Sequence, residues 1–474
     1  MKTIVARRPL PPYDSSSPEG RRSIWGWWAF DWASQPYFTL GLTFVFGPYF
    51  ANVASNYYLG TGLDEVAADA QAQSLWSLGQ TLTGVVIALC APVLGAMADN
   101  AGRRMPWVVL FSVFYVVGAA GLWFLMPDGG FLIGALICFG IGLIGAEFTT
   151  IFTNSLLPEL GRKEEIGRIS GSGFAVGYAG GVTALFIMLL LFVEQDNGRT
   201  LAGVAPMLGL DPHTLQGTRF VGPFMALWYV IFMIPFALWV REVRRTPKPG
   251  GVARALGDLA ALVRSLPRKR SLTAYLASSM FYRDALNALY AFGGTYAALV
   301  LNWTITQVGI FGIVAAITSA IATWLGGRVD ERTGPKPLVI WMILVLMGVC
   351  LFVLGMTRES IWGLGLAVGS GIPDTAFFIC GAIIGGAGGV LQASSRTLMV
   401  RHAEPDKPTE AFGLYAFSGK ATAFLGPGLI FLTTSTLGDT RLGMLPLFGL
   451  FALGLLLLWW VNPEGRTDPL EAAA

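Results

Sequence analysis

The chain has 474 residues, of which 54% are hydrophobic and only 13% are charged. Soluble domains carry roughly 25% charged residues, so this composition excludes an ordinary soluble protein. The formal net charge of +3 says little as a total, and we expect no nucleic-acid partner. Apolar runs of ~20 residues recur along the whole length, which indicates a polytopic α-helical protein of the lipid bilayer.

In chain order, the apolar runs predict twelve transmembrane helices, separated by clusters of glycine, proline and aspartate. A polar, proline-rich segment, residues 1–22, precedes them, and we interpret it as a cytoplasmic tail because it lacks the pattern of a cleavable signal peptide. The spans are expected at residues 23–54, 73–97, 105–126, 131–157, 169–194, 218–241, 271–301, 306–327, 337–356, 374–396, 411–436 and 441–461.

The longest hydrophilic connection, residues 242–270, divides the chain into two halves of six spans. We expect an N-terminal half over residues 23–241, a C-terminal half over residues 271–461, and a cytoplasmic tail over residues 462–474. Within the basic connection, apolar and basic side chains alternate at near-helical spacing, at Leu256, Leu259, Val263 and Leu266 and at Arg254, Arg264 and Arg268. Two interpretations remain open here, a helix lying on the inner leaflet or a plain solvated linker.

Lysine and arginine are distributed unevenly between the two sides of the predicted membrane. Most of the 32 basic residues fall in the first tail, in residues 242–270, and in the other loops on that side. The basic residues in or beside the opposite loops are Arg199, Arg219, Arg358 and Arg441. Because cytoplasmic loops carry the excess of Lys and Arg, we expect both termini in the cytoplasm.

Matching segments occur in the same order in the two halves, which indicates a duplication. Asp31, Ser34 and Tyr37 in the first span have the spacing of Asp284, Asn287 and Tyr290 in the seventh. Gly171 and Gly177 of the fifth span match Gly413 and Gly419 of the eleventh. Parallel repeats of six spans are typical of major-facilitator transporters, in which the substrate site lies between the halves near the bilayer midplane.

A third match lies in the short loops after the second and eighth spans, which we call the latch segments. The first reads Gly95-xxx-Asp99-xx-Gly102-Arg103-Arg104, and the second reads Gly326-xxx-Asp330-xxx-Gly334-Pro335-Lys336. Glycine lets two helices approach closely, and Asp99 is expected at a helix end where the arginines of the turn can reach it. Such a conformational latch would break when the halves rock, whereas the alternative is a positive loop that merely contains glycine.

Five charged residues lie inside the expected spans, at Asp31, Glu147, Arg283, Asp284 and Lys420. A charge at that depth costs several kcal/mol, so it marks a candidate functional site. These charges sum to −1, which leaves one acid without a basic partner. That acid is a candidate proton carrier, because burial favours its neutral form.

Polar residues extend from these charges along one face of several spans. The faces hold Asp31, Ser34 and Gln35 in the first span, Glu147, Thr150 and Asn154 in the fourth, and Asp284 and Asn287 in the seventh. Gln392 in the tenth span is expected to add a neutral contact. Faces that converge would form a hydrophilic cavity, the predicted substrate or proton site. The alternative is that the charges pair and only hold helices together.

The helical positions also suggest partners for the charges. Adjacent helix residues point about 100° apart, so Arg283 and Asp284 are not expected to pair with one another. We expect Arg283 to pair with Asp31 or Glu147, and Asp284 with Lys420. Three tryptophans at the start of the first span, Trp25, Trp27 and Trp28, are interpreted as a belt at the cytoplasmic membrane surface rather than as a substrate-stacking site.

The sequence offers no sign of catalytic or metal chemistry. The two histidines, His213 and His402, fall in loops on opposite sides, and no nucleophile–base pair or nucleotide-binding loop is visible. The four cysteines lie in apolar runs without metal-ligand spacing. We therefore expect no enzyme activity, no cofactor and no metal, and we expect a monomer.

Several segments resemble one branch of the major-facilitator superfamily, which includes the vacuolar autophagy-related amino-acid effluxers and their bacterial relatives. They are Ala-Phe-Asp-Trp-Ala-Ser at 29–34, Asn-Ser-Leu-Leu-Pro-Glu at 154–159, Tyr-Arg-Asp-Ala-Leu-Asn at 282–287 followed by Ala-Phe-Gly-Gly at 291–294, and Gly-Leu-Tyr-Ala-Phe-Ser-Gly-Lys at 413–420. The chain departs from the branch at Ser34, where asparagine is frequent, and at Thr153, where tyrosine is expected. Glu147 is not part of the branch's pattern.

The resemblance implies a twelve-span major-facilitator fold and secondary transport, with amino acids as the substrates of the fungal members. The short loops resemble bacterial members, which points to the cytoplasmic membrane of a bacterium. We expect a transporter of a small polar solute that works by alternating access, either facilitative or proton-coupled. The alternative is a non-transporting membrane assembly factor or chaperone on the same scaffold, with structurally paired acids and no aqueous cavity at the midplane.

Overall fold

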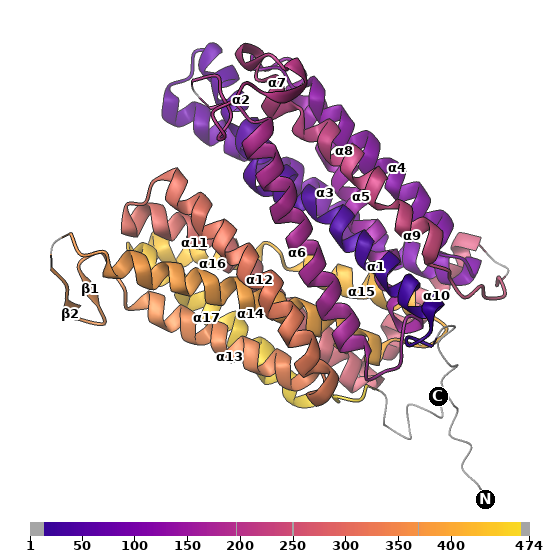
Figure 1. Ribbon diagram of the computed structural model, residues 1–474. Coiled ribbons are helices and arrows are strands. Elements are labelled where there is room, and N and C mark those ends of the chain that lie inside the picture. The colour runs from indigo at the N-terminus through magenta and orange to yellow at the C-terminus, as the bar shows by residue number, and fades with distance from the viewer. Residues whose placement is uncertain (1–13, 196, 249–250, 368, 466–474) are drawn as a thin grey trace, which may run out of the picture.

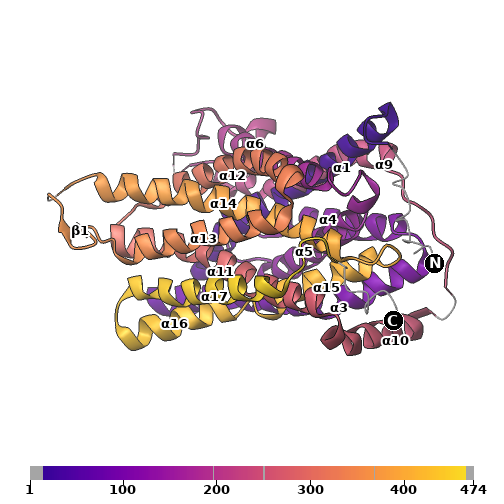
Figure 2. The ribbon, with the colours of Figure 1, turned by 90° about the horizontal axis from the view of Figure 1, so that it is seen from below.

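The computed structural model describes residues 14–195, 197–248, 251–367 and 369–465. Two helical bundles pack against one another and diverge on one side (Figure 1). We call the end where helix α10 and both described chain ends lie the linker side (Figure 2). The opposite end, which carries helices α2 and α7 and the two-stranded hairpin, is the hairpin side.

The first bundle, the N bundle, contains the first fourteen elements. They are α1 (Pro18–Pro36), the π-helix η1 (Tyr37–Phe44), α2 (Phe46–Gly60), α3 (Glu65–Ala101), α4 (Met105–Gly121), η2 (Leu122–Phe124), α5 (Leu132–Asn154), η3 (Leu157–Glu159), α6 (Ile166–Leu191), η4 (Met207–Gly209), η5 (Pro212–Thr214), α7 (Gln216–Arg219), α8 (Val221–Phe232) and α9 (Ile234–Trp239).

A linker helix, α10 (Gly251–Ser265), with the short turn η6 (Leu266–Arg268), leads to the second bundle, the C bundle. Its elements are α11 (Arg270–Leu301), α12 (Ile305–Thr333), α13 (Pro335–Leu354), the antiparallel strands β1 (Ser360–Ile361) and β2 (Leu364–Gly365), α14 (Ile372–His402), α15 (Pro408–Ala421), α16 (Leu425–Leu437), η7 (Thr440–Gly443), α17 (Met444–Leu457) and η8 (Leu458–Trp460).

Within the described residues, nine helical segments are long and apolar enough to cross a membrane by length and composition. The other three spans of the twelve are the interrupted run α1–η1–α2, the polar helix α11, and the interrupted pair α15–α16. The predicted twelve-helix major-facilitator fold is therefore confirmed. The three less regular spans hold four of the five predicted intramembrane charges, Asp31, Arg283, Asp284 and Lys420.

Glycine allows close helix contacts inside each bundle. A Cβ atom at Gly173 of α6 would lie 2.5 Å from Asp31 Oδ2 on α1. In the C bundle, a Cβ atom at Gly385 of α14 would lie 2.1 Å from the Ala315 carbonyl oxygen on α12. Such small-residue faces let transmembrane helices pack backbone to backbone.

The linker begins by following the first latch segment and then forms α10. The backbone N–H groups of Arg245 and Lys248 donate to the carbonyl oxygens of Gly102 and Asn100, at 3.0 and 2.8 Å. Of the two interpretations left open for this region, the amphipathic helix is the one present, and α10 packs along α3. Its location on a membrane surface stays a prediction.

Candidate functional site

An ion pair joins the two bundles about halfway along their helices. Lys420, at the end of α15, donates to Glu147 Oε1 of α5 at 2.8 Å. The side chains of Glu147 and Lys420 are 19% and 30% exposed, so the pair is not sealed from solvent. Both residues were predicted site residues, but neither was predicted to be the partner of the other.

A second and more deeply buried cation, Arg396 of α14, reaches from the C bundle into the N bundle. Its Nε donates to Ser170 Oγ at 2.9 Å and its Nη2 to the Ser170 carbonyl oxygen at 2.8 Å. Its Nη1 donates to Asn154 Oδ1 at 3.0 Å and lies 3.5 Å from Asp31 Oδ2. The Arg396 side chain is 4% exposed, so this ion pair is almost fully desolvated.

Two aromatic rings of the N bundle also contact the guanidinium of Arg396. Its guanidinium carbon lies 4.6 Å from the centre of the Trp27 ring and 4.2 Å from that of Phe174. A cation over an aromatic face is attracted by the ring's electron density, most strongly where water is excluded. Trp27 is fully buried and its indole N–H donates to the Thr153 carbonyl at 2.8 Å.

The predicted tryptophan belt is wrong for Trp27, which is fully buried and packs against Arg396. Its indole N–H finds a carbonyl partner on α5, so Trp27 lies inside the bundle rather than at a lipid interface. The Trp28 indole N–H donates to the Ile169 carbonyl at 2.9 Å, and Trp25 is 60% exposed. For these two residues the belt stays a prediction.

The partner predicted for Arg283 is also wrong. Arg283 Nη1 donates to the Tyr415 carbonyl at 2.7 Å, and its guanidinium carbon lies 4.0 Å from the centre of the Tyr415 ring. Both contacts are within the C bundle, because this face of α11 packs on α15. The acids proposed as partners are taken by Arg396 and Lys420.

Asp284 does not pair with Lys420. Its Oδ2 accepts the backbone N–H of Gly426 at 2.9 Å, and the residue is 1% exposed. Gly426 lies in the first turn of α16, where unpaired N–H groups and the helix dipole favour a negative charge. The break between α15 and α16 supplies the partner that the sequence did not reveal.

The neutral residues of the predicted site divide between the interface and the bundle interiors. Gln392 Nε2 donates to Tyr178 Oη across the interface at 3.4 Å. Ser34 is buried and its hydroxyl donates to the Asp31 carbonyl of its own helix at 3.5 Å. Gln35 packs against Gly181 of α6, where an added Cβ atom would lie 2.8 Å from the Gln35 Cγ. Asn287 is exposed.

The first latch segment connects the bundles on the linker side, but by different contacts from those predicted. Asp99 accepts the backbone N–H groups of Thr409 and Glu410 at 3.3 and 2.7 Å, at the start of α15. A Cβ atom at Gly95 would lie 2.5 Å from the Thr409 carbonyl oxygen. Asp99 therefore occupies a helix N-terminus of the other bundle.

The arginines of that turn have other positions. Arg104 forms an ion pair with Glu159 and donates to the Ser155 carbonyl at 2.7 Å, while Arg103 is exposed. The predicted contact of these arginines with Asp99 is thus wrong. The positive end of α15 satisfies Asp99, and Arg104 is held inside the N bundle.

The second latch segment lies in an equivalent place. A Cβ atom at Gly167, in the first turn of α6, would lie 2.5 Å from Asp330 Oδ1. One turn further, a Cβ atom at Gly171 would lie 2.6 Å from the Gly327 Cα, so two glycines meet across the interface. The remaining predicted members stay within the C bundle. Gly326 packs on Val390, Gly334 lies beside Arg401, and Lys336 Nζ donates to the Val461 carbonyl at 2.7 Å.

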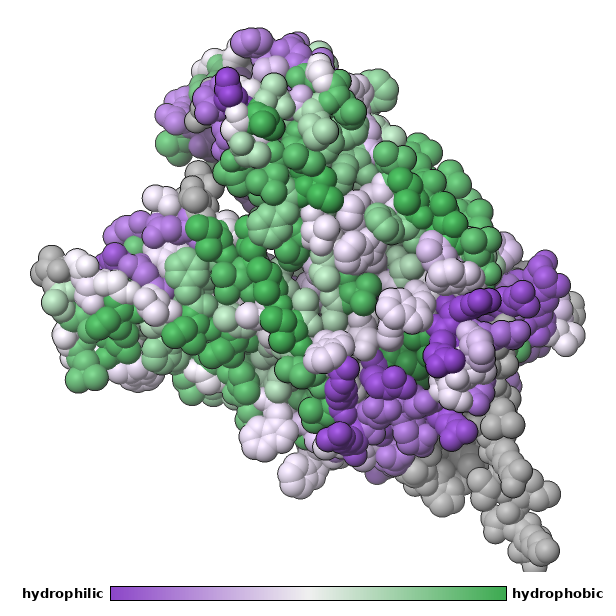
Figure 3. Space-filling model, viewed as in Figure 1, coloured by the Kyte–Doolittle hydropathy of each residue, from purple (hydrophilic) through white to green (hydrophobic). Residues whose placement is uncertain are grey.

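The two bundles are therefore closely packed on the linker side. Toward the hairpin side, the space-filling view shows an indentation between the two lobes (Figure 3). The ring of Phe44 in η1 crosses between the bundles here, since a Cβ atom at Gly312 of α12 would lie 2.6 Å from it.

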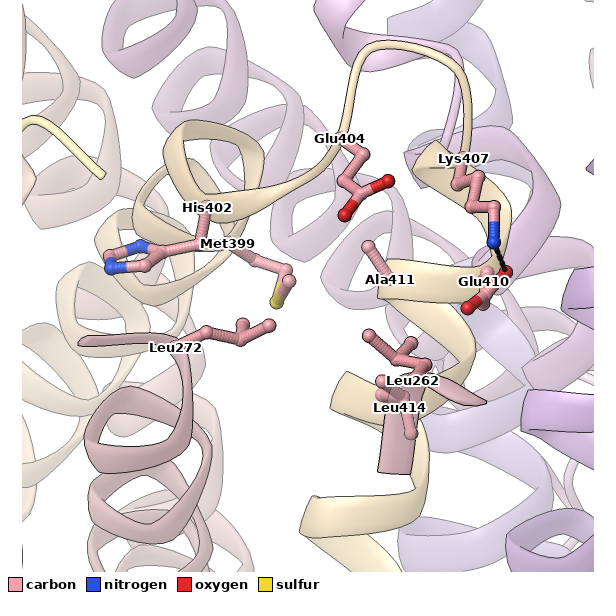
Figure 4. Close-up of a pocket in the computed structure, with 9 residues that line it drawn as sticks. All are labelled: Leu262, Leu272, Met399, His402, Glu404, Lys407, Glu410, Ala411 and Leu414. Carbon is pink, nitrogen blue, oxygen red and sulfur yellow. Dashed lines mark ion pairs between the residues drawn. The ribbon is translucent and has the colours of Figure 1, made fainter. Parts of the chain in front are cut away.

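A small pocket lies on the linker side, where α10 covers the ends of α11, α14 and α15 (Figure 4). Its lining residues are Leu262, Leu272, Met399, His402, Glu404, Lys407, Glu410, Ala411 and Leu414. Within it, Lys407 Nζ lies 3.4 Å from Glu410 Oε2. None of the predicted site residues lines this pocket, so we do not assign the solute to it.

Sequence reasoning missed Arg396, which was placed at the edge of the tenth span and counted with the loop cations. The helix in fact continues to His402, which places Arg396 inside the protein. With Arg396 included, the intramembrane charges sum to zero, so the argument for one leftover acid fails. The signal that could have found Arg396 is its position one helical turn after Gln392, on the same face.

Comparisons with known proteins agree with this architecture. The family described as "Vacuole effluxer Atg22 like" matches residues 19–468. The chain belongs to this family. The Atg22-like chain is 24% identical over 447 residues to the "Uncharacterized MFS-type transporter YxiO" of Bacillus subtilis, covering 93% of this chain and 95% of that protein.

Fungal members match over a smaller share. "Autophagy-related protein 22-1" of Aspergillus clavatus is 23% identical over 343 residues, which covers 68% of this chain and 53% of the fungal protein. The Atg22-like chain thus spans about half the length of its fungal relatives.

Solved structures show the same fold at low sequence identity. The proton:xylose symporter XylE has a TM-score of 0.67 at 14% identity, covering 97% of this chain and 100% of that chain. FucP in the outward conformation has a TM-score of 0.65 at 13% identity, covering 94% and 99%. The Atg22-like protein is a membrane transporter of the major facilitator superfamily.

Proposed function

We propose that this protein is a secondary transporter that moves a small polar solute, an amino acid or a similar metabolite, by alternating access with proton coupling. The observation that carries the proposal is the ion pair between Glu147 and Lys420, which joins the bundles and remains partly exposed. Alternating access requires contacts between the halves that form and break with each cycle.

The charges of this pair suit a zwitterionic solute. An ammonium group would bind Glu147 and a carboxylate would bind Lys420, so that the solute replaces the direct contact between them. Because each charge keeps a partner, the exchange does not leave an unpaired charge at this depth. The exposed Asn287 of α11 supplies a neutral hydrogen-bonding group on the C bundle.

The linker side is proposed to face the cytoplasm of a bacterium, with both termini on that side and the protein acting as a monomer in the cytoplasmic membrane. The excess of lysine and arginine on that side supports this orientation. The Bacillus relative, which the chain matches over nearly its full length, supports a bacterial setting.

A non-transporting assembly factor would also hold its acids in structural pairs, and Asp31 and Glu147 are indeed paired. Both pairs, however, connect one bundle to the other rather than stapling helices within a bundle. This placement favours a moving interface, and it is the reason for preferring transport.

The proposal can be tested with purified protein by a thermal-shift screen against single amino acids and other small metabolites. A ligand at about 100 times its Kd stabilises the folded state by about 2.7 kcal/mol, which is readily measured. The same ligand should enter proteoliposomes that carry the protein. Flux should fall by about tenfold or more in Glu147→Gln and Lys420→Met, as expected for loss of one charged contact.

The matched control is Glu19→Gln, which removes an exposed acid from the first turn of α1. Its flux should stay near that of the wild type. Unchanged flux in both interface variants would contradict the proposed site, and the absence of any stabilising or transported solute would favour the assembly factor.

A further inference from the structure

We propose that Arg396 stabilises the state in which the two bundles are closed on the linker side, and that Asp31 takes up a proton when Arg396 leaves the N bundle. Arg396 is a positioning residue here, because it acts on the bundles and on Asp31 rather than on the solute. The inference rests on the proposed alternating access. It adds the residue that fixes one state and the acid that is uncovered in the other.

The first step of the argument is the direction of the contacts. Arg396 belongs to the C bundle, whereas its hydrogen bonds to Ser170 and Asn154, its ion pair with Asp31, and its stacking on Trp27 and Phe174 are all with the N bundle. A guanidinium is a planar group with N–H donors in a fixed geometry, so its hydrogen bonds and stacking contacts form together and break together. Separating the bundles at this level must therefore pull Arg396 out.

The second step compares this contact with its neighbours. Arg168 and Glu331 also form a cross-bundle ion pair, at 3.2 Å, but their side chains are 41% and 32% exposed. Water weakens such a pair, and its contribution is small. The glycine contact between Gly171 and Gly327 presents smooth, uncharged surfaces. Asp99, which accepts backbone N–H groups at the start of α15, is a second buried charged contact on this side. Arg396 differs from it because its partner, Asp31, is itself charged, so opening at Arg396 also leaves an acid without its cation.

The third step concerns what Arg396 leaves behind. Asp31 Oδ2 is buried without a hydrogen bond and has Arg396 as its ion-pair partner. The segments packed around Asp31 supply Gly173 and Gly177 of α6, Asn154 of α5 and Trp27 of its own helix, none of which titrates. On the C bundle, Tyr415 of α15 is the titratable side chain near Arg396, and its hydroxyl donates to Ser395 Oγ at 2.8 Å.

A buried carboxylate that loses its cation is strongly destabilised, and adding a proton relieves this cost. One proton from the medium bonds to the Asp31 carboxylate as Arg396 leaves, and it returns to the medium when Arg396 re-enters. A higher proton concentration therefore favours the state in which the linker side is open. Proton coupling is thus placed at Asp31, and proton binding favours opening of the linker side.

The test is a cross-linking measurement that does not depend on transport. Cys90, Cys138, Cys350 and Cys380 are replaced by alanine, and Arg168→Cys and Glu331→Cys are introduced as reporters of the closed linker side. We call this double-cysteine protein the parent. A short bifunctional thiol reagent then cross-links its two bundles in detergent or in liposomes. Arg396→Gln should lower the ratio of closed to open protein by about tenfold, the change expected when one charge-assisted hydrogen bond of the closed state is lost, and cross-linking should slow accordingly.

Two further variants distinguish a specific role of Arg396 from a general defect. Ser170→Ala with Asn154→Ala removes hydrogen-bond acceptors of Arg396 without changing any charge, and it should slow cross-linking in the same direction. Arg283→Gln removes a matched intramembrane arginine whose contacts lie within the C bundle, and cross-linking should remain at the parent rate. Size-exclusion profiles establish that each variant is folded.

The proton step is read from the parent at about pH 5 and about pH 8, which bracket the range where a buried carboxylate without a cation gains a proton. Because only the thiolate reacts, each cross-linking rate is divided by the rate at which the same reagent labels the two single-cysteine proteins at that pH. The normalised rate of the parent should be lower at the lower pH, and Asp31→Asn should lose this difference. If both Arg396→Gln and the double variant Ser170→Ala with Asn154→Ala cross-link at the rate of the parent, Arg396 does not stabilise the closed linker side. A parent without pH dependence would overturn the proton step. Neither result depends on whether a transported solute is found, so this inference and the proposed function fail separately.

Discussion

The first and seventh spans carry polar residues at the same three positions, and the last two of these positions differ in exposure. In the first span, Ser34 of α1 and Tyr37 of η1 are buried, and Tyr37 donates to the Phe139 carbonyl at 2.6 Å. In α11, the equivalent Asn287 is exposed and Tyr290 is 38% exposed. Tyr37 thus contributes to the packing of the N bundle, whereas Asn287 and Tyr290 are the residues that we propose are available to a solute.

The two aspartates differ in the same manner. Asp31 is paired across the interface with Arg396, whereas Asp284 lies inside the C bundle at the N-terminus of α16. The difference has a structural origin, because α6 is continuous and α15–α16 is broken. Only the broken span offers unpaired N–H groups in mid-membrane, so only Asp284 can be satisfied within its own half. Both halves have an aspartate at this position, but packing gives it a different role in each.

The largest effect is expected from breaking the Asp31–Arg396 pair on one side only. Arg396→Ala should lower the free energy of unfolding by about 3–5 kcal/mol, because it leaves a buried carboxylate without its cation. The double variant Asp31→Asn with Arg396→Gln should lose clearly less than the sum of the single variants. Chemical unfolding of the four proteins in detergent gives the coupling energy, and strict additivity would contradict a buried pair.

The next effect concerns Asp284. Asp284→Ala should lower the free energy of unfolding by about 1–3 kcal/mol, since the Gly426 N–H would lose its buried acceptor. Unlike Arg396→Gln, it should leave the Arg168–Glu331 cross-linking rate unchanged. A change in that rate would show that Asp284, too, acts across the interface, and the contrast between the two aspartates would fall.

A smaller effect separates the two tyrosines. Tyr37→Phe should cost about 0.5–1.5 kcal/mol of stability, the usual contribution of one hydrogen bond. Tyr290 is 38% exposed, but its hydroxyl packs against Gly388 of α14, so Tyr290→Phe should cost less stability than Tyr37→Phe while changing the affinity for a stabilising solute. Thermal unfolding with and without the solute measures both quantities, and equal stability losses would remove the distinction between the first and seventh spans.

The smallest effect is expected at Ser34. Ser34→Ala should change stability by no more than about 0.5 kcal/mol, because its hydroxyl only donates weakly to its own helix. Asn287→Ala should be equally stable but should bind the solute less tightly. A large loss of stability in Ser34→Ala would mean that this hydroxyl has a structural role beyond its bond to the Asp31 carbonyl.

The sequence by itself determined the membrane class and the twelve-span fold, and it predicted a duplication, which stays a prediction. These follow from local properties, namely the length of apolar runs, the spacing of glycines and the matching positions in the two halves. Helical periodicity also placed Asp31, Glu147, Asn154 and Gln392 on faces that the structure brings to the interface.

Only the tertiary structure decided which charges meet. Lys420 pairs with Glu147 rather than Asp284, and Asp99 lies at the start of α15 rather than beside Arg104. Arg396 was not recognised at all, because its role depends on partners from three helices of the other bundle. A buried charge pairs with whichever partner the packing places beside it, including a helix end, and helical periodicity does not predict that partner.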